Sequence, residues 1–305
     1  MTVSALDGHH AERGNKSIRQ KLALRGIDGV TLLILPAAIF IVGVFIYPFF
    51  YGLVLSFTPM AGGGALANYQ AFFSDPYLYN TIAATLRLAL PVTILSLAFS
   101  IPIAMRVRLM ERQRLLTTIL VLPLTLGTVL VAEGLLNYLG PQGWFSRILI
   151  LIGLIEEPLK LTNNYWGVLA SLIITVFPFT FLLTLSYITG IDPALEKAAA
   201  THGANSWQRF RFVMLPLLVP GIAIAFCLTF VQAFAVFPSA VLLGAPSGDT
   251  RVISIAAAQA AFEQYDFSMA SAIAMIMAVV QLGVVVAILA IRNMFYRGTT
   301  SGGKG

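Results

Sequence analysis

Six apolar segments dominate this 305-residue sequence and restrict its fold to a membrane bundle. About 20 apolar helical residues cross the hydrocarbon layer of a bilayer. Backbone polar groups in lipid must be satisfied within the protein, which favours helices for such segments. Charged residues make up only 10% of the chain, against about 25% in soluble domains. We therefore predict an all-α membrane protein with six transmembrane helices, at residues 30–57, 81–105, 115–139, 165–190, 217–244 and 267–292.

The positive charges fall almost entirely on one side of these predicted spans. Six spans place both ends of the chain on the same side, and cytoplasmic loops are enriched in lysine and arginine. One side holds the basic clusters at residues 13–25, 106–114, 197–211 and 292–304, whereas the other holds only Arg147, Lys160 and Arg251. We therefore predict that both termini are cytoplasmic, with tails at 1–26 and 297–305 flanking one transmembrane domain at 27–296.

Two ionisable residues fall inside predicted spans, where an unpaired charge is unfavourable. Arg87 lies about six residues from the outer end of the second span, and Glu133 lies about six residues from the outer end of the third. At 1.5 Å per residue both would lie roughly 9 Å below the outer surface, so we predict an Arg87–Glu133 contact. Such a pair is either structural or part of a substrate path. Asn137 and Gln232 are weaker candidates for that path, because single polar residues in bundles often only join helices.

The sequence lacks the motifs of the common enzyme classes. It contains no GxxxxGK[ST] phosphate-binding loop, no HExxH and no GxSxG. The one cysteine, Cys227, lies in an apolar run, which excludes a disulfide framework. A weak metal site at His9 and His10 is less favoured than a simple polar tail. We expect no catalytic residue, no metal site and no nucleic-acid partner, because the net charge of +6 is distributed by membrane side.

The polar connector at residues 192–216 interrupts the apolar second half of the chain. Asp192 is suited to cap a helix, Pro193 to occupy its first position, and Glu196 to interact with the positive end of the helix dipole. The run of alanines that follows favours helix, and Gly203 is suited to end it. We therefore predict a short cytoplasmic helix that docks on another protein.

This connector carries a recognisable pattern. The segment EKAAATHGANSWQRFRFVMLPLLVPG resembles the EAA loop of permease subunits in binding-protein-dependent ABC importers, in which E-A-A precedes a glycine, an aliphatic residue and L-P. The stretches LANYQAFF, NTIAATLRLAL and LGAPSGDTRVISI extend the resemblance over nearly the whole chain, most closely to the polyamine and opine branch. The resemblance implies ATPase-coupling roles for Glu196, Lys197, Ala198, Ala199, His202, Gly203, Val213, Leu215 and Pro216.

The resemblance also implies an assembly. It predicts the type I ABC importer permease fold in the bacterial inner membrane, in contact with lipid and with a second permease subunit, related or identical. Two ATPase subunits would bind ATP and Mg²⁺, and an extracytoplasmic solute-binding protein would deliver the solute. This chain would bind no cofactor itself. A polyamine or opine is the expected solute, with a sugar or ferric iron as alternatives.

The connector departs from the family motif at the position of the glutamate. Counting back from Gly203, the glutamate of the family motif falls at Lys197, and Glu196 lies one residue earlier. One residue rotates a helix position by about 100°, so the contact with the ATPase is altered, replaced by Lys197 or restored by Glu196. Phe210, Phe212 and Trp207 are candidates for its apolar part. An ion-coupled transporter or a membrane scaffold without transport remain alternatives of other classes.

Overall fold

The computed structural model describes residues 29–60 and 62–295, and within these ranges every regular element is a helix. Six helical stretches are long and apolar enough to cross a membrane, in agreement with the six predicted spans. The two predicted tails, with His9 and His10, lie outside the described residues. The chain divides into two compact units, residues 1–54 and 55–305, and each is considered by itself.

The described part of the first unit, from residue 29 onward, is continuously helical, and its last helix extends two residues beyond the unit. Helix α2 (Gly29–Ile41) leads through the π-helical turn η1 (Val42–Ile46) into α3 (Tyr47–Ser56). Its residues 33–56 are strongly hydrophobic, with a mean hydropathy of 2.4 in the most apolar window. This stretch is the first of the six candidate spans.

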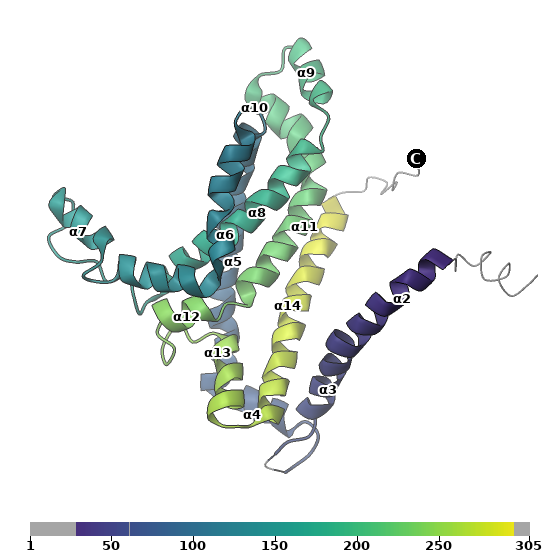
Figure 1. Ribbon diagram of the computed structural model, residues 1–305, viewed down its shortest axis with the longest axis vertical. Coiled ribbons are helices and arrows are strands. Elements are labelled where there is room, and N and C mark those ends of the chain that lie inside the picture. Colours follow the sequence, from purple (N-terminus) through teal and green to yellow (C-terminus); the bar gives the residue numbers. More distant parts are fainter. Residues whose placement is uncertain (1–28, 61, 296–305) are drawn as a thin grey trace, which may run out of the picture. The chain divides into compact units, whose positions relative to one another are not determined.

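The second unit contains the remaining helices. Long helices run between its two ends, with α9 and α10 at one end and α4 at the other (Figure 1). The elements are α4 (Ala67–Ser74), α5 (Pro76–Val107), α6 (Gln113–Leu139), α7 (Trp144–Leu151), α8 (Tyr165–Thr189), α9 (Pro193–Thr201), α10 (Ser206–Arg209), the π-helical turn η2 (Phe210–Met214), α11 (Leu215–Phe234), α12 (Pro238–Leu243), α13 (Ile253–Ala258), the π-helical turn η3 (Gln259–Glu263) and α14 (Phe267–Phe295).

Helix α8 is the centre of this unit, and α5 and α11 pack against it. The main apolar core lies between these helices and includes Phe72, Phe230 and Phe234, all fully buried. Small hydroxyl side chains join the helices where they approach closely, as is common in membrane bundles. The pairs are Ser100–Thr184 at 3.0 Å, Thr180–Thr229 at 3.0 Å and Ser171–Ser239 at 2.9 Å.

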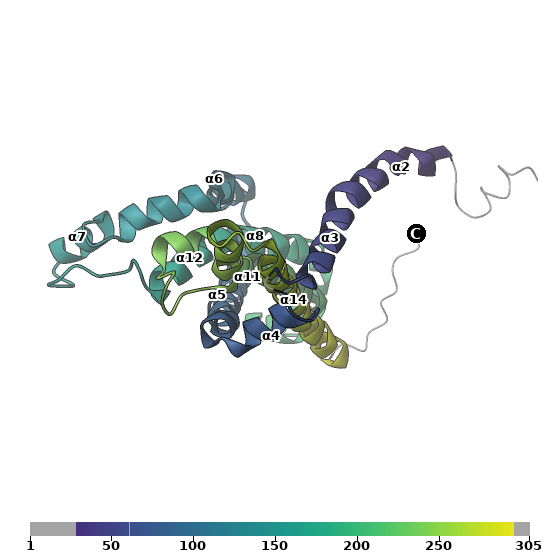
Figure 2. The same ribbon diagram turned by 90° about the horizontal axis from the view of Figure 1, so that it is seen from below.

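Helix α6 is bent at Gly127, whose φ of 76° is unfavourable for any residue with a side chain. The part after the bend turns away from the α5–α8–α11–α14 group and leads to α7, as both views show (Figures 1 and 2). Helix α7 has eight residues, and together with α6 it makes up the third candidate span, Gln113–Leu151. Because of this bend, the residues after Gly127 do not continue along the direction of the first part of α6, which changes the side chains that they can contact.

The fifth span differs from the prediction at both ends. It begins at Ser206, because α10, η2 and α11 are continuous, and it ends at Phe234 rather than at residue 244. Phe237 has φ −134° and ψ −60°, outside the helical region, and Pro238 starts α12 at a position where its missing N–H is tolerated. The apolar run from 217 to 244 therefore holds two helices rather than one.

Candidate functional site

Helix α9 begins as its sequence predicts. The Asp192 carboxylate accepts a hydrogen bond of 2.8 Å from the Ala194 N–H, which satisfies one of the free amides of the first turn. Pro193 occupies the first helical position, and Glu196 lies in the first turn. The local chemistry of these three residues is sufficient to start a helix here.

The end of α9 and the start of α10 form a closed joint. Gly203 has φ 82°, its N–H donates to the Ala200 carbonyl, and the Ala204 N–H donates to the Ala199 carbonyl, which is the Schellman arrangement. On the other side, the Asn205 side chain accepts from the Gln208 N–H and the Gln208 side chain accepts from the Asn205 N–H, both at 2.9 Å. This capping box and the Schellman turn leave few backbone groups unsatisfied between the two helices.

Glu196 points to α5 and forms an ion pair with Arg108, the only ion pair recorded within residues 29–60 and 62–295. The two side chains are only 9% and 21% exposed for Arg108 and Glu196 respectively. Arg108 caps the C-terminus of α5, and Glu196 lies at the N-terminus of α9, so each charge also interacts favourably with its own helix dipole. The pair ties the start of α9 to the end of α5.

A small apolar core lies beside this ion pair and anchors the connector. We call it the connector core; Met214 and Leu218, both 1% exposed, pack there against α5 and α8. Phe210 is half-buried against the same cluster, so only part of its ring is available for the predicted apolar contact with an ATPase. Its buried members are Ala104, Val107, Phe181, Leu185, Ile188, Met214 and Leu218.

The remaining connector residues divide into exposed and packed positions. Two large aromatic side chains point outward, with Trp207 67% and Phe212 71% exposed. The motif positions that are half-buried are Ala199, Val213 and Leu215, and those that are exposed are Lys197, Ala198, His202, Gly203 and Pro216. The exposed surface of the connector therefore combines a positive charge with aromatic area.

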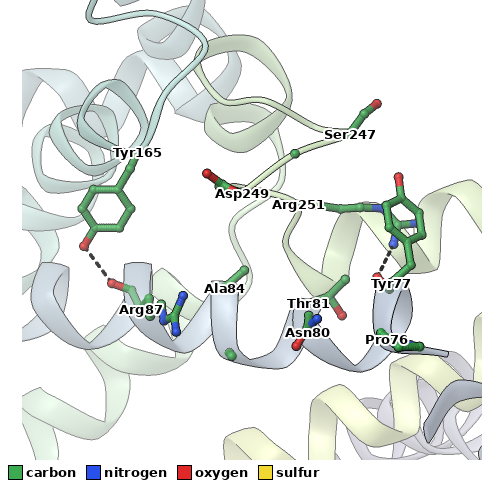
Figure 3. A pocket seen from close by; sticks show the side chains of 12 residues that line it. Pro76, Tyr77, Asn80, Thr81, Ala84, Arg87, Tyr165, Ser247, Asp249 and Arg251 are labelled. Carbon is green, nitrogen blue, oxygen red and sulfur yellow. Dashed lines mark hydrogen bonds between the residues drawn. The ribbon is translucent and has the colours of Figure 1, made fainter. Parts of the chain in front are cut away.

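The opposite end of α5 borders a cavity of about 750 Å³ (Figure 3). Helix α5, the start of α8 and the loop between α12 and α13 contribute its walls. We call it the arginine cavity, because two arginines line it. Its lining residues are Pro76, Tyr77, Asn80, Thr81, Ala83, Ala84, Arg87, Tyr165, Ser247, Gly248, Asp249 and Arg251.

Arg251 is fixed within the wall of this cavity and is only 6% exposed. Its Nε and Nη2 donate to Gln259 Oε1 at 3.2 and 2.6 Å, and its Nη1 donates to the Tyr77 carbonyl at 2.9 Å. The guanidinium also lies 3.7 Å from the centre of the Tyr77 ring, a favourable cation–π geometry. Burial lowers the pKa of Arg251, but a guanidinium remains charged at neutral pH.

The predicted Arg87–Glu133 contact is wrong. Both residues lie in the described part of the chain and form no ion pair. Arg87 lines the arginine cavity, where its carbonyl accepts a 2.8 Å hydrogen bond from the Tyr165 hydroxyl. Glu133 lies six residues beyond the bend at Gly127 and is exposed, so equal depth along straight helices does not apply. Asn137 donates to the Glu133 carbonyl, and neither Asn137 nor the half-buried Gln232 lines the cavity.

Two functional features escaped the sequence reasoning. Arg108 belongs to a basic cluster that the sequence analysis used only to orient the chain in the membrane. The signal for its ion pair was Glu196, the one acidic side chain in the first turn of the connector helix α9. Arg251 is part of the LGAPSGDTRVISI stretch, and its partner Gln259 lies eight residues later, directly after α13. Among the described residues, no group of three His, Cys, Asp or Glu could hold a metal ion.

Comparison with known proteins connects this geometry to a family. Residues 111–292 match the family described as binding-protein-dependent transport system inner membrane component. The match covers α6 to most of α14 and contains the entire connector. It includes Arg251 but not Arg87 or Arg108.

Individual relatives cover different parts of the chain. The spermidine/putrescine permease protein PotB of Haemophilus influenzae is 32% identical over 181 residues, covering 59% of this chain and 63% of PotB. The probable starch degradation products permease AmyD of Thermoanaerobacterium thermosulfurigenes is 27% identical, covering 81% and 87%. The probable sulfate permease cysT of Chlorella vulgaris is 30% identical, covering 58% and 64%. The chain thus spans slightly less than two thirds of PotB and cysT.

Solved structures share the fold. A chain of a bacterial alginate ABC transporter, in complex with an alginate pentasaccharide-bound periplasmic protein, has a TM-score of 0.78 at 23% identity, covering 93% of this chain and 99% of that chain. A chain of the MetNI methionine ABC transporter has a TM-score of 0.58 at 14% identity, covering 72% and 96%. At these identities the likeness concerns the fold alone.

Proposed function

Because this chain belongs to the binding-protein-dependent transport system inner membrane component family, we propose that it is the membrane-spanning permease subunit of an ATP-driven solute importer. The family match over residues 111–292, which contains the whole connector, is the observation that carries the proposal. Both termini and the connector lie on the cytoplasmic side in this proposal. The concentration of lysine and arginine on that side supports the orientation.

The importer has several subunits. This chain has no phosphate-binding loop, so two separate ATPase subunits bind ATP and Mg²⁺. A second permease, more plausibly a related chain than an identical one, completes the membrane part, and an extracytoplasmic protein delivers the solute. The fold shared with a chain of the alginate transporter, which was solved with a periplasmic binding protein, supports this assembly.

Helix α9 couples the ATPase to the membrane helices. The closed joint at Gly203–Asn205 makes α9 and α10 move together, and the connector core attaches them to α5, α8 and α11. Closure of an ATPase dimer that grips α9 therefore displaces these helices as a unit. The bundle then changes from inward-open to outward-open.

Glu196, which lies one residue before the glutamate position of the motif, and Lys197, which occupies that position, have different roles in this mechanism. Glu196 is engaged with Arg108 inside the chain, whereas Lys197 is exposed. We therefore assign the internal contact to Glu196 and the contact with the ATPase to Lys197, together with Trp207 and Phe212. An acidic side chain on the ATPase surface would complement Lys197.

The test is co-purification of the membrane and ATPase subunits, with uptake measured in proteoliposomes. Ala199→Glu places a charge at a half-buried position of α9 and should lower both ATPase association and uptake at least tenfold. Glu157→Ala, an exposed change in the loop before α8, serves as a control. Unchanged association and ATP-dependent uptake in Ala199→Glu would contradict the coupling role. Uptake without any ATPase subunit would indicate an ion-coupled transporter, and no uptake at all would indicate a scaffold.

The solute is proposed to be a small charged metabolite. The resemblance to the polyamine and opine branch and the 32% identity to a spermidine/putrescine permease support this class. Relatives named for starch degradation products and sulfate keep sugars and inorganic anions as candidates, with ferric iron as a further alternative. Uptake assays with the binding protein encoded beside this chain would distinguish them.

A further inference from the structure

The arginine cavity contains more positive than negative charge. Two arginines, Arg87 and Arg251, and one carboxylate, Asp249, line it. Within residues 29–60 and 62–295, the recorded ion pair is Arg108–Glu196, so neither cavity arginine has a carboxylate within ion-pair distance. The lining residues therefore carry one more positive than negative charge, with Asp249 as the carboxylate among them. Asp75 and Glu263, outside the lining, also lie near enough to Arg251 to favour its charged form.

Arg251 carries the stronger part of this argument. A guanidinium has five N–H donors, and its hydrogen bonds to Gln259 and to the Tyr77 carbonyl use three of them. Two donors remain on a side chain that is only 6% exposed and borders the cavity. A buried charge is unfavourable unless it is paired. The neutral acceptors, the Tyr77 ring and the more distant carboxylates of Asp75 and Glu263 stabilise this charge, and the two unused N–H donors can bind an anion in the cavity.

Arg87 supplies an accessible second charge. Its side chain is exposed and points along the cavity from α5, while the Tyr165 hydroxyl holds the backbone at this position (Figure 3). Asn80 and Thr81 on the same helix add neutral polar groups to the wall. Guanidinium donors form strong, often bidentate hydrogen bonds with carboxylates and with tetrahedral oxyanions such as phosphate, and sulfate is a tetrahedral oxyanion of the same kind.

A polycation is disfavoured by the same charges. Like charges repel, and they do so more strongly where the effective dielectric constant is lower than that of water. An ammonium group would be attracted by Asp249 and repelled by both arginines. We propose that the arginine cavity binds an anionic group, a carboxylate or sulfate, of the transported solute. This inference rests on the proposed function, and it favours an opine-like or sulfate-like solute over a polyamine.

The experiment measures ligand binding to the complete importer in nanodiscs of zwitterionic lipid, using succinate, sulfate and spermidine as probes. Succinate or sulfate should bind, and spermidine should not. Arg87→Gln should weaken anion binding about tenfold, and Asp249→Asn should strengthen it about threefold by removing a like charge. Arg147→Gln, an exposed arginine outside the cavity, should leave binding unchanged. Thermal melting of each variant excludes misfolding as the cause.

Three outcomes would overturn the proposal. Spermidine binding that Asp249→Asn abolishes would identify a cation site. Equal loss in Arg87→Gln and Arg147→Gln would show that anion binding reflects surface charge only. Displacement of succinate and sulfate when anionic lipid is added would identify a lipid headgroup site. Failure of the importer proposal has a separate signature, because ATP-dependent uptake would then be absent while anion binding to the purified complex could still be measured.

Discussion

Helix α5 brings two arginines into opposite situations. At its C-terminal end, Arg108 is largely buried and paired with Glu196, beside the apolar connector core. Twenty-one residues earlier, Arg87 is exposed, faces a cavity of about 750 Å³ and lacks an ion-pair partner among the described residues. The helical rise places the two about 32 Å apart.

This comparison distinguishes an arginine that stabilises the fold from an arginine that can bind a ligand. Arg108 is satisfied within the chain, so its contribution is to hold α9 against α5. The guanidinium of Arg87 has no ion-pair partner among the described residues, so its charge is available to a bound molecule. The residue type is the same in both places, and only the surroundings distinguish the two roles.

The strongest test of this comparison is a charge reversal at the paired end. Arg108→Glu or Glu196→Arg alone should destabilise the chain by about 1–3 kcal/mol, between the values for exposed and buried ion pairs. ATP-driven uptake should fall at least tenfold in each. The double reversal should recover most of the thermal stability but not all, because each charge then opposes its helix dipole by about 0.3–1 kcal/mol.

Arg106→Glu is the matched control, since Arg106 lies in the last turn of α5 and is exposed. It changes the same helix dipole without breaking the ion pair. If Arg106→Glu and Arg108→Glu destabilise equally, the ion pair contributes nothing specific.

A second test concerns the exposed neighbour of Glu196. Lys197→Glu should change the free energy of unfolding by no more than about 0.5 kcal/mol, as is usual for surface substitutions. Its association with the ATPase subunits, measured by co-purification and by titration in nanodiscs, should weaken about tenfold. Lys160→Glu reverses an equally exposed lysine outside the connector and should have no effect. Normal association of Lys197→Glu would assign the ATPase contact elsewhere.

A third, smaller effect is expected at the joint of the connector. A Cβ at position 203 would meet no atom within 4 Å, so Gly203→Ala tests backbone strain alone. A left-handed conformation is unfavourable by about 1–2 kcal/mol for residues other than glycine, and thermal melting should show a loss of that size. Gly190→Ala is the control, because Gly190 caps α8 with an ordinary φ of −75°. Equal melting temperatures for both variants would contradict the Schellman assignment.

The smallest effect is predicted for coupling between Arg87 and Glu133, the two residues that the sequence analysis placed at equal depth in the membrane. Arg87→Glu should reduce anion binding, Glu133→Arg should do little, and their double variant should equal the sum of the two within about 0.5 kcal/mol. The measurement is a double-mutant cycle on uptake and thermal stability. Restoration by the double reversal would show that the two residues pair in the functioning importer.

Local chemistry was sufficient to predict much of the fold. Apolar length predicts the six spans, and the cap residues Asp192, Pro193 and Gly203 predict the start and end of α9, because these preferences act within a few residues. The end of the fifth span was not predictable from hydropathy, because the apolar run continues from α11 into α12. The non-helical backbone at Phe237 and Pro238 at the start of α12 separate the two helices.

The site was less predictable because it depends on tertiary geometry. The Arg87–Glu133 prediction assumed straight antiparallel helices, and the single unusual backbone angle at Gly127 removes that basis. The Arg108–Glu196 pair joins residues 88 positions apart and required the packing of α5 beside the connector. Both errors concern which side chains meet, and neither concerns which segments are helical.

The closed joint between α9 and α10 has a consequence for energy conversion. A flexible link at Gly203–Asn205 would bend under load, and the ATPase could then turn over without moving the bundle. The paired hydrogen bonds on both sides of the link oppose such slippage. In the proposed importer, a looser joint would therefore raise the number of ATP molecules hydrolysed for each solute imported.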